Sequence, residues 1–359
     1  MIGGWPVRIA VIPGDGIGKE VTAEAVRVLR AVADRSGKSI DLEMLPWSAD
    51  YYLQSGVTIP PNGYDLLRDE FDAILLGALG DPRVPDNAHT RDILLGIRFA
   101  LDLYVNYRPV KLLDDRLCPL KGRGRADVQF VVMRENTEGV YVGVGGRFKA
   151  GTPDEIAVQE EINTFKGVDR IIRYAFEYAA AHGLTRVAMA DKSNAMPQGH
   201  ALWQRVFRSV AAEYPAIEAS HFYIDALAMF LVTDPGQFQV IVTNNMFGDI
   251  VTDIGGALQG GLGMAASGNI HPGRTSMFEP VHGSAPPLAG KNIANPMGAI
   301  LTAALLLEHG GWSDEAKRIE AAVEAAVRER QTTKDIGGAL GTSQVGDWIA
   351  DHVRHSTAT

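Results

Sequence analysis

The feature that most constrains the fold of this chain is the alternation of short β-rich runs with longer stretches of helical periodicity. Residues 8–12 form an apolar run typical of a strand, and residues 19–36 place apolar side chains at helical spacing. This alternation predicts an α/β fold with helices packed on a mainly parallel sheet. Further strands are predicted at residues 39–45, 71–76, 129–133, 186–190, 221–224 and 240–243, and further helices at residues 168–182, 199–213 and 249–259.

One segment interrupts this alternation. Residues 143–165 combine alternating side chains with turn-forming glycines and a proline, which predicts a β-arm or loop that projects from the second lobe. The basic tract at residues 121–125 is short and has no interleaved aromatic side chains, so it is interpreted as a solvated loop.

Composition excludes several classes of function. The chain has 359 residues, enough for two lobes, and a net charge of -9. An acidic chain is a poor general ligand for nucleic acid or anionic membranes. No apolar run reaches the roughly 18 to 20 residues of a membrane span, and the N-terminus lacks the features of a secretory signal. Because the single cysteine, Cys118, cannot form an internal disulfide, we expect a cytoplasmic protein.

The first motif is glycine-rich and lies at residues 13–18, between a predicted strand and a predicted helix. Phosphate-binding loops occupy this place in Rossmann folds. However, Gly14, Gly16 and Gly18 follow a G-x-G-x-G spacing rather than the G-x-G-x-x-G of that fold. Two interpretations remain open, a tight structural turn and a loop that binds a cofactor.

Acidic side chains and a lysine follow the later predicted strands. Asp249 and Asp253 are four residues apart, so a helix would place both carboxylates on one face, where a divalent cation would offset their repulsion. The alternative is a pair of solvated carboxylates. Asp225 and Lys192 each follow another apolar strand, at the sheet edge where ligands bind α/β proteins. A partly buried Lys192 next to a cation could serve as a base.

Three arginines, Arg98, Arg108 and Arg134, lie beside apolar runs. Each alone is typical of a structural role, but the three guanidinium groups together would suit a substrate with two carboxylates. The segment around Glu279 and His282 is rich in glycine and proline, which favours a ligand-binding loop over a core segment.

Taken in order, these motifs resemble those of the β-decarboxylating dehydrogenases, which include isopropylmalate, isocitrate, homoisocitrate and tartrate dehydrogenases. The resemblance extends over nearly the whole chain. It is carried by residues 12–18, 134–139, 245–249, 279–286 and 333–336.

The resemblance implies a two-lobed α/β fold like that of isopropylmalate dehydrogenase, with mainly parallel sheets, a projecting β-arm and a cofactor-binding lobe that is not a Rossmann fold. Residues 1–103 and 260–359 would form the cofactor-binding lobe. Residues 104–259 would form the lobe for substrate, metal and dimerisation.

The implied reaction is an NAD-dependent oxidative decarboxylation of a malate-type 2-hydroxy acid, with Mg²⁺ or Mn²⁺ bound by Asp225, Asp249 and Asp253. Lys192 would assist loss of the hydroxyl proton while hydride passes to NAD⁺. Tyr141 would protonate the enolate that remains after CO₂ leaves. The resemblance also implies a homodimer with shared active sites, in which one subunit lends Lys192 and Asp225 to Asp249 and Asp253 of the other.

The resemblance also assigns binding residues. Arg98, Arg108 and Arg134 would hold the carboxylate that departs, and Asp225 would contact the substrate as well. Contacts to NAD are expected from Ile12, Glu279, His282, Gly283, Ser284, Ala285, Ala294 and Asn295.

Leu94 and Leu95 resemble the apolar pair that faces the isopropyl group in isopropylmalate dehydrogenases. The expected substrate is therefore 3-isopropylmalate, the expected product 2-oxoisocaproate and the expected pathway leucine biosynthesis. Tartrate, D-malate and homoisocitrate remain alternatives within the same chemistry. Three positions depart from the family pattern: Arg91 stands for a glutamate near the nicotinamide, Ala195 for a larger apolar residue, and Pro287 for an aspartate that binds the adenosine ribose.

The alternative outside the enzymes is a non-catalytic regulatory subunit, because some members of the family have this role. Such a subunit should have lost a metal ligand, the lysine or the tyrosine. Tyr141, Lys192 and the three aspartates are all present, so the sequence favours an enzyme.

Overall fold

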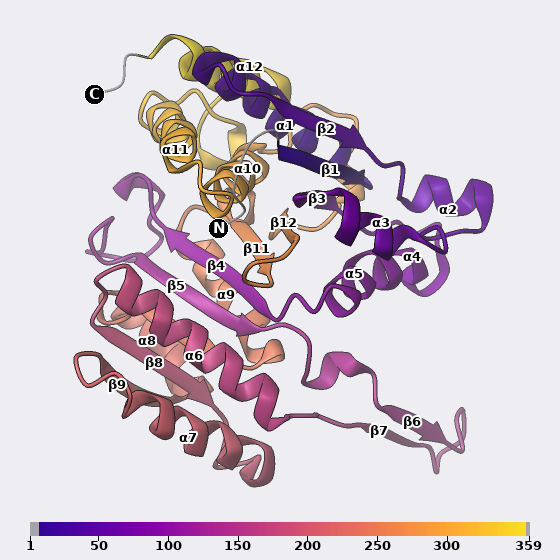
Figure 1. Cartoon of the computed structure of the whole chain (residues 1–359), viewed down its shortest axis with the longest axis vertical. Helices are drawn as coiled ribbons and strands as arrows, with labels where there is room; N and C mark the ends of the chain where they lie inside the picture. Colours follow the sequence, from indigo (N-terminus) through magenta and orange to yellow (C-terminus); the bar gives the residue numbers. More distant parts are fainter. Residues whose placement is uncertain (1–6, 357–359) are drawn as a thin grey trace. The chain divides into compact units, whose positions relative to one another are not determined.

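The computed structural model describes residues 7–356, and the contacts within the chain divide it into two compact units (Figure 1). Unit 1 consists of Met1–Leu103, Pro109–Arg125 and Gly256–Thr359, and unit 2 of Tyr104–Arg108 and Ala126–Gly255. The first six and last three residues of the predicted cofactor-binding lobe lie outside the described residues.

The segment Pro109–Arg125 groups with unit 1, whereas the sequence places it with residues 126–255 in one lobe. Long cationic side chains of this segment pair with acids of a helix near the C-terminus. Lys111 and Arg125 contact Glu320 and Glu324 of α11 (Ser313–Arg328) at 3.0 and 2.6 Å.

The sheet of unit 1 has the strand order β2 (Ile40–Met44), β1 (Val7–Gly14), β3 (Ala73–Ala78), β12 (Ser276–Pro280) and β11 (Ala266–Ile270). Neighbouring strands run parallel from β2 to β12, and β11 is antiparallel to β12. The register places Gly14 opposite Ala78, at the ends of β1 and β3. The loops after these two strands therefore begin at one edge of the sheet.

Helix α1 (Gly18–Ser36) buries Val21, Ala25 and Val28, at the apolar spacing that predicted it. It packs against α10 (Met297–His309) and α12 (Thr342–His355). The remaining helices of unit 1, besides α11, are α2 (Ala49–Ser55), α3 (Gly63–Glu70), α4 (Ala88–Thr90) and α5 (Gly96–Ala100).

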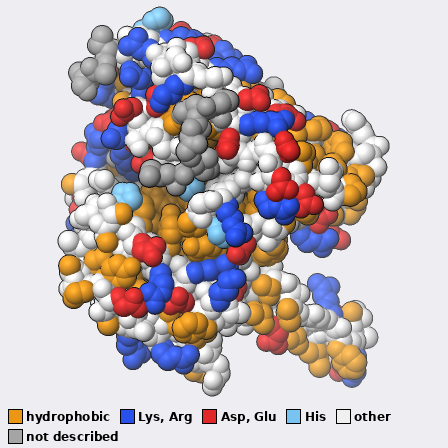
Figure 2. All heavy atoms as spheres, in the orientation of Figure 1, with side chains coloured by type: hydrophobic (Ala, Val, Ile, Leu, Met, Phe, Trp, Pro, Cys, Tyr) orange, Lys and Arg blue, Asp and Glu red, His pale blue; other side chains and the backbone are white. Residues whose placement is uncertain are grey.

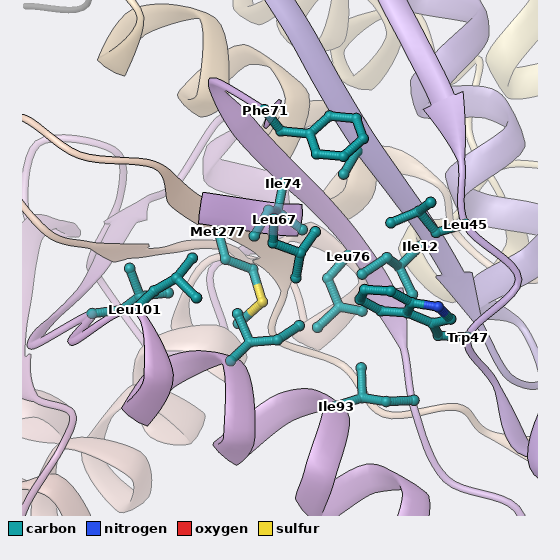
Figure 3. Close-up of a cluster of buried hydrophobic side chains, with 13 residues drawn as sticks. Ile12, Leu45, Trp47, Leu67, Phe71, Ile74, Leu76, Ile93, Leu101 and Met277 are labelled. Atoms are coloured by element: carbon teal, nitrogen blue, oxygen red, sulfur yellow. The ribbon is translucent and has the colours of Figure 1, made fainter. Parts of the chain in front are cut away.

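Side chains from β1, β3 and β12 meet side chains of α3 and α5 in a buried hydrophobic cluster (Figure 3). Trp47 and Ile93 belong to this cluster and are almost fully buried. Ile93 lies in a π-helical turn, η2 (Arg91–Leu95), and Leu94 packs against the cluster from the same turn. The cluster therefore holds in place the turn that carries the predicted substrate contacts.

The sheet of unit 2 has the strand order β4 (Val105–Lys111), β5 (Gln129–Glu135), β10 (Val240–Thr243), β8 (Arg186–Asp191) and β9 (Glu218–Tyr223). The pairs from β5 to β9 are parallel. Helices α6 (Phe165–Ala181) and α7 (Pro197–Ala211) pack together, and α6 covers β5, β10 and β8 (Figure 1). The other helices are α8 (Ile224–Thr233) and α9 (Asn245–Leu258).

The predicted β-arm is confirmed. Strands β6 (Gly145–Phe148) and β7 (Ile156–Gln159) form an antiparallel hairpin, and hydrophobic side chains gather on it at the lower right of Figure 2. Phe148, Ile156 and Val158 are each about half exposed or more, at 62%, 53% and 48%. An exposed apolar patch of this kind marks an interaction surface more often than an isolated apolar residue does.

One predicted strand is confirmed but ends one residue earlier than expected. The strand expected at residues 221–224 ends at Tyr223, and Ile224 begins α8. Leu227 and Leu231 are buried at helical spacing, which explains why the apolar run continues as a helix. Asp225 consequently lies in the first turn of α8. Within residues 7–356, no helix has both the length and the apolar character required to span a membrane.

A partly buried histidine in unit 1 gives a prediction about stability. Burial lowers the pKa of His309, at the end of α10, to about 4. Below about pH 6.5 the unfolded chain binds a proton there that the folded chain does not, so the free energy of unfolding falls from pH 6.5 towards pH 4. We expect His309→Leu to lose less stability than the wild type between pH 7 and 4.5, by about 2 kcal/mol in urea unfolding. Equal losses in both proteins would contradict this.

Candidate active site

In unit 2, the candidate residues collect at one edge of the sheet. Strands β5, β10 and β8 are parallel, and their register aligns Arg134 with Thr243 and Thr243 with Ala190. Their carboxyl ends therefore meet at the same edge, where α/β folds bind ligands. Arg134, the start of α9 and the turn that carries Lys192 all lie at this edge.

Arg134 is 1% exposed, and its guanidinium group contacts the first turns of α9. Nε and Nη2 donate to Oδ1 of Asn245 at 2.9 and 2.7 Å, and Nη1 donates to Oδ1 of Asp249 at 2.6 Å. The helix can approach this closely because residue 248 is glycine, where a Cβ would lie 2.5 Å from Cγ of Arg134. Gly248 thus allows a buried cation to contact two polar residues of α9.

A second buried guanidinium group lies beside the same carboxylate. Arg108 of β4 donates to Oδ1 of Asn106 at 2.6 Å and to the hydroxyl of Thr252. Its Nη2 is 3.4 Å from Oδ1 of Asp249. Two positive charges therefore converge on one carboxylate that is itself 43% exposed, which makes this edge suitable for binding a further anion.

The two acids of α9 lie in the same helix, as their spacing predicts. Tyr141 donates its hydroxyl to Oδ2 of Asp249 at 3.0 Å. Asp253 is largely exposed to solvent. The part of its carboxyl group that is buried, together with the nearby charge of Asp249, raises its pKa. A raised pKa signals uncompensated negative charge, which a bound cation would relieve.

Lys192 and Asp225 form a pair of their own. Nζ of Lys192 is 2.6 Å from Oδ1 of Asp225, and this contact lowers the pKa of the Asp225 carboxyl. Within the described part of one chain, no three acidic, histidine or cysteine side chains lie close enough to hold a metal ion. Asp249 and Asp253 nevertheless provide carboxylate oxygens of the kind that Mg²⁺ and Mn²⁺ prefer.

In unit 1, the glycine-rich turn at residues 13–18 is built around a buried acid, Asp15. Its carboxylate accepts hydrogen bonds from the backbone N–H groups of Ala49 and Gly80, at 2.7 and 2.9 Å, and contacts Nε2 of His89 at 2.7 Å. These contacts join the loops that follow β1, β2 and β3. The turn therefore has a structural role, and Asp15 and Gly16 also line a cavity beside it.

The same turn supports the loop at residues 282–285. The N–H of Ile17 donates to the carbonyl of Ser284 at 2.8 Å. In that loop, burial lowers the pKa of His282, and its Nε2 is buried without a hydrogen-bond partner among the described residues. An unpaired polar atom in this position fits a ligand that supplies the missing hydrogen bond. Beside the turn lies a cavity of about 570 Å³, lined by Lys19, Arg83 and Ala289 among others.

The other predicted residues of unit 1 are placed as follows. Arg98 is buried and donates to Oε1 of Glu279 at 2.7 Å, so its charge already has a partner. Leu94 and Leu95 lie partly exposed in the π-helical turn, a feature frequent at functional sites. Ile12 has no exposed surface. Ser284, Ala294 and Asn295 are also buried. Ala285 is partly exposed, and Gly283 is exposed.

Several residues that form the site were not singled out from the sequence. Asn245 and Thr252 contact the buried guanidinium groups, and Asp15 organises the glycine-rich turn. Asn245 and Asp15 stand inside motifs that the sequence does indicate. A polar residue at the first position of a helix that begins an acidic motif is the signal that could have identified Asn245.

A family profile described as isocitrate/isopropylmalate dehydrogenase matches residues 8–349. The chain belongs to this family. The 3-isopropylmalate dehydrogenase of Thermobifida fusca is 47% identical over 349 residues, which cover 97% of this chain and 98% of that protein. The 3-isopropylmalate dehydrogenase of Rhodococcus jostii is 49% identical over 347 residues, with 96% and 99% covered.

Two solved structures agree with the fold of this dehydrogenase. An isocitrate dehydrogenase from Methylococcus capsulatus matches with a TM-score of 0.88 and 35% identity, over 98% of this chain and 100% of that chain. The TT0538 protein from Thermus thermophilus matches with a TM-score of 0.85 and 34% identity, over 98% of this chain and 68% of that chain. The predicted family and α/β fold are confirmed, and the chain is an oxidoreductase.

The contact between the glycine-rich turn and the loop at Ser284 gives a prediction for this dehydrogenase. Gly16 and Gly37 both have positive φ, at 52° and 65°. A Cβ at Gly16 would lie 2.1 Å from the carbonyl oxygen of Ser284, whereas a Cβ at Gly37 would meet nothing within 4 Å. Both alanine substitutions carry the strain of left-handed backbone, about 1 kcal/mol, and only Gly16→Ala adds overlap.

We therefore expect Gly16→Ala to lower the free energy of unfolding by about 2 kcal/mol more than the control, Gly37→Ala. Urea unfolding of both variants measures the difference. Equal destabilisation would mean that the turn does not support the Ser284 loop.

Proposed function

We propose that this dehydrogenase converts 3-isopropylmalate into 2-oxoisocaproate by metal-dependent oxidative decarboxylation with reduction of NAD, a step of leucine biosynthesis. Two relatives that are 47% and 49% identical along nearly the whole chain are named 3-isopropylmalate dehydrogenase, which supports this substrate. The observation that carries the chemistry is the pair of buried guanidinium groups, Arg108 and Arg134, beside the acidic face of α9.

The donor set on α9 fits Mg²⁺ or Mn²⁺, because Asp249 and Asp253 offer hard carboxylate oxygens and the pKa of Asp253 is raised by burial and by Asp249. We assign the third ligand to Asp225 of the partner subunit. When bound, the ion would polarise the 2-hydroxyl of the substrate and stabilise the negative oxygen of the product enolate.

The side chains of unit 2, with Arg98 of unit 1, would then bind the carboxylate and transfer the protons. Arg108 and Arg134 hold the carboxylate that leaves as CO₂, with Arg98 as a further ligand that the resemblance adds. Lys192 would take the proton of the 2-hydroxyl, and a bound NAD⁺ would serve as the acceptor of the hydride from C2. After the bond to CO₂ breaks, Tyr141 gives its hydroxyl proton to C3 of the enolate, and Asp249 orients that hydroxyl through the 3.0 Å hydrogen bond.

The substrate side chain and the cofactor are assigned to unit 1. Leu94 and Leu95 contact the isopropyl group, since their apolar side chains are partly exposed in the π-helical turn. The unpaired Nε2 of His282 supports a nucleotide at the loop 282–285. The other cofactor residues, proposed by resemblance, are Ile12, Glu279, Ala294 and Asn295; Ile12, which has no exposed surface, would act by shaping the site from beneath.

The assembly we propose is a homodimer with shared active sites. It would supply the third metal ligand that one chain lacks among its described residues. Exposed apolar side chains on α8 and α9, Met229 at 53% and Ile250 at 53%, support an interface there. The compartment we propose is the cytoplasm, where the single cysteine, Cys118, would stay reduced.

The substrate is tested by measuring kcat/KM for 3-isopropylmalate, D-malate, tartrate, isocitrate and homoisocitrate, each with NAD⁺ and NADP⁺ and with Mg²⁺ or Mn²⁺. We expect 3-isopropylmalate with NAD⁺ to be preferred at least about tenfold, or about 1.4 kcal/mol in the transition state. A preference for D-malate or tartrate would contradict the proposed substrate, but the proposed chemistry of the site would still stand. A preference for NADP⁺ would overturn the cofactor.

The catalytic roles predict that Lys192→Ala and Asp249→Asn each lower kcat, by roughly 10²- to 10⁴-fold. The control is Lys166→Ala, which removes an exposed lysine of α6. We expect this control to retain full activity. Unchanged turnover in both site variants would refute an enzyme that uses these groups.

Shared active sites make a further prediction for these two variants. When they are mixed and allowed to exchange subunits, each mixed dimer would contain one site with both Lys192 and Asp249 intact. Activity should recover to about a quarter of the wild-type value, because about half the dimers are mixed and each has one intact site. No recovery after subunit exchange would show that each site is built from a single chain.

A further inference from the structure

The turn that carries Lys192 is held by a buried histidine. The backbone N–H of Lys192 donates to Nδ1 of His200 at 2.7 Å, and the His200 side chain is 1% exposed. A backbone N–H can only donate, so Nδ1 must be the unprotonated nitrogen of the ring. The hydrogen bond therefore requires neutral His200 with its proton on Nε2.

A buried carboxylate faces the other ring nitrogen. Nε2 of His200 lies 3.2 Å from Oε2 of Glu161, whose side chain is 9% exposed. Glu161 stands just after β7, at the base of the β-arm. The carboxylate accepts a hydrogen bond from Nε2–H and thereby selects the tautomer that the N–H of Lys192 requires. Hydrogen-bond partners of metal-binding histidines fix the ring in the same way.

The same carboxylate also contacts the start of α9. Nδ2 of Asn244 donates to Oε1 of Glu161 at 2.7 Å, and Oδ1 of Asn244 accepts the N–H of Phe247 at 2.8 Å. Asn244 therefore caps the helix that carries Asp249 and Asp253. Glu161 therefore contacts two elements of the site: it bonds the histidine that holds the Lys192 turn, and it bonds the residue that caps the acidic helix.

We propose that Glu161 and His200 are positioning residues for the reaction, which fix the backbone of Lys192 and the first turn of α9 within one subunit. In the proposed dimer, this network therefore connects the Lys192 of one shared active site to the acidic helix of the other. This inference rests on the proposed function. Burying a carboxylate with an imidazole costs desolvation that two apolar side chains would avoid, so packing alone gives no reason for the pair. The orientation of Lys192 does give a reason for the pair, because a shift of about 1 Å at a reacting group can lower the rate about 100-fold.

Two substitutions at residue 200 separate orientation from packing. In His200→Asn, the amide oxygen can take the place of Nδ1 and accept the Lys192 N–H. In His200→Gln, the amide reaches the place of Nε2, so it keeps the contact with Glu161 and loses the acceptor for Lys192. We expect His200→Gln to lower kcat roughly 10- to 100-fold with little change in KM, and His200→Asn to restore most of the loss.

Glu161→Gln tests the tautomer itself. If its amide oxygen stays on Asn244, its NH₂ group faces Nε2 of His200, which moves the ring proton to Nδ1 and opposes the N–H of Lys192. If the amide is reversed, its NH₂ group opposes that of Asn244 instead. Either orientation breaks one of the two contacts, so kcat should fall. The control is Glu213→Gln, which replaces a carboxylate that pairs with Arg173 between α6 and α7 and should leave kcat unchanged.

The measurements are kcat and KM of these variants with whichever 2-hydroxy acid the wild type prefers, together with ¹⁵N NMR of His200 in the wild-type protein. Loss in His200→Gln, recovery in His200→Asn and a proton on Nε2 support the proposal. Equal activities of the two His200 variants, or a proton on Nδ1, overturn it. The NMR result needs no substrate, so a wrong substrate and a wrong positioning role give different outcomes.

Discussion

The burial of the Arg134 guanidinium group is the constraint on which the site in unit 2 depends. A buried cation must be paired and hydrogen-bonded, and Arg134 meets this need through Asn245 and Asp249 on α9. Gly248 lets the helix come close enough. Consequently, the guanidinium group of Arg134 holds α9, the helix with the acidic pair, against β5. We assign the same guanidinium group to binding the substrate carboxylate.

Parallel pairing places the remaining groups. In unit 2, β5, β10 and β8 end at one edge, so Arg134, α9 and the Lys192 turn are neighbours although they are far apart in the sequence. In unit 1, β1 and β3 end together, and the turn around Asp15 contacts the loop at Ser284. In each unit, several candidate residues therefore lie near the ends of buried strands or on the loops and helix starts that follow them, where α/β folds bind ligands.

Much of this was predictable from the sequence, because local patterns carry it. The helix containing Asp249 and Asp253 follows from spacing, and the alternation of strands and helices gives the α/β class. What local patterns do not carry are pairings between distant segments. Glu161 lies in an arm whose sequence is typical of a projecting loop, and only the folded chain brings it to His200, 39 residues away. Likewise, only the folded chain brings Pro109–Arg125 into ion pairs with α11, about 200 residues away.

Diffraction from crystals grown with Mn²⁺ and 3-isopropylmalate would test the central claim most directly, since the anomalous signal of manganese locates the metal independently of the protein. We predict one peak per subunit at Asp249 and Asp253, completed by Asp225 of the partner subunit, with a substrate carboxylate on Arg108 and Arg134. A metal ion bound away from α9, or a substrate carboxylate bound away from these two arginines, would contradict it.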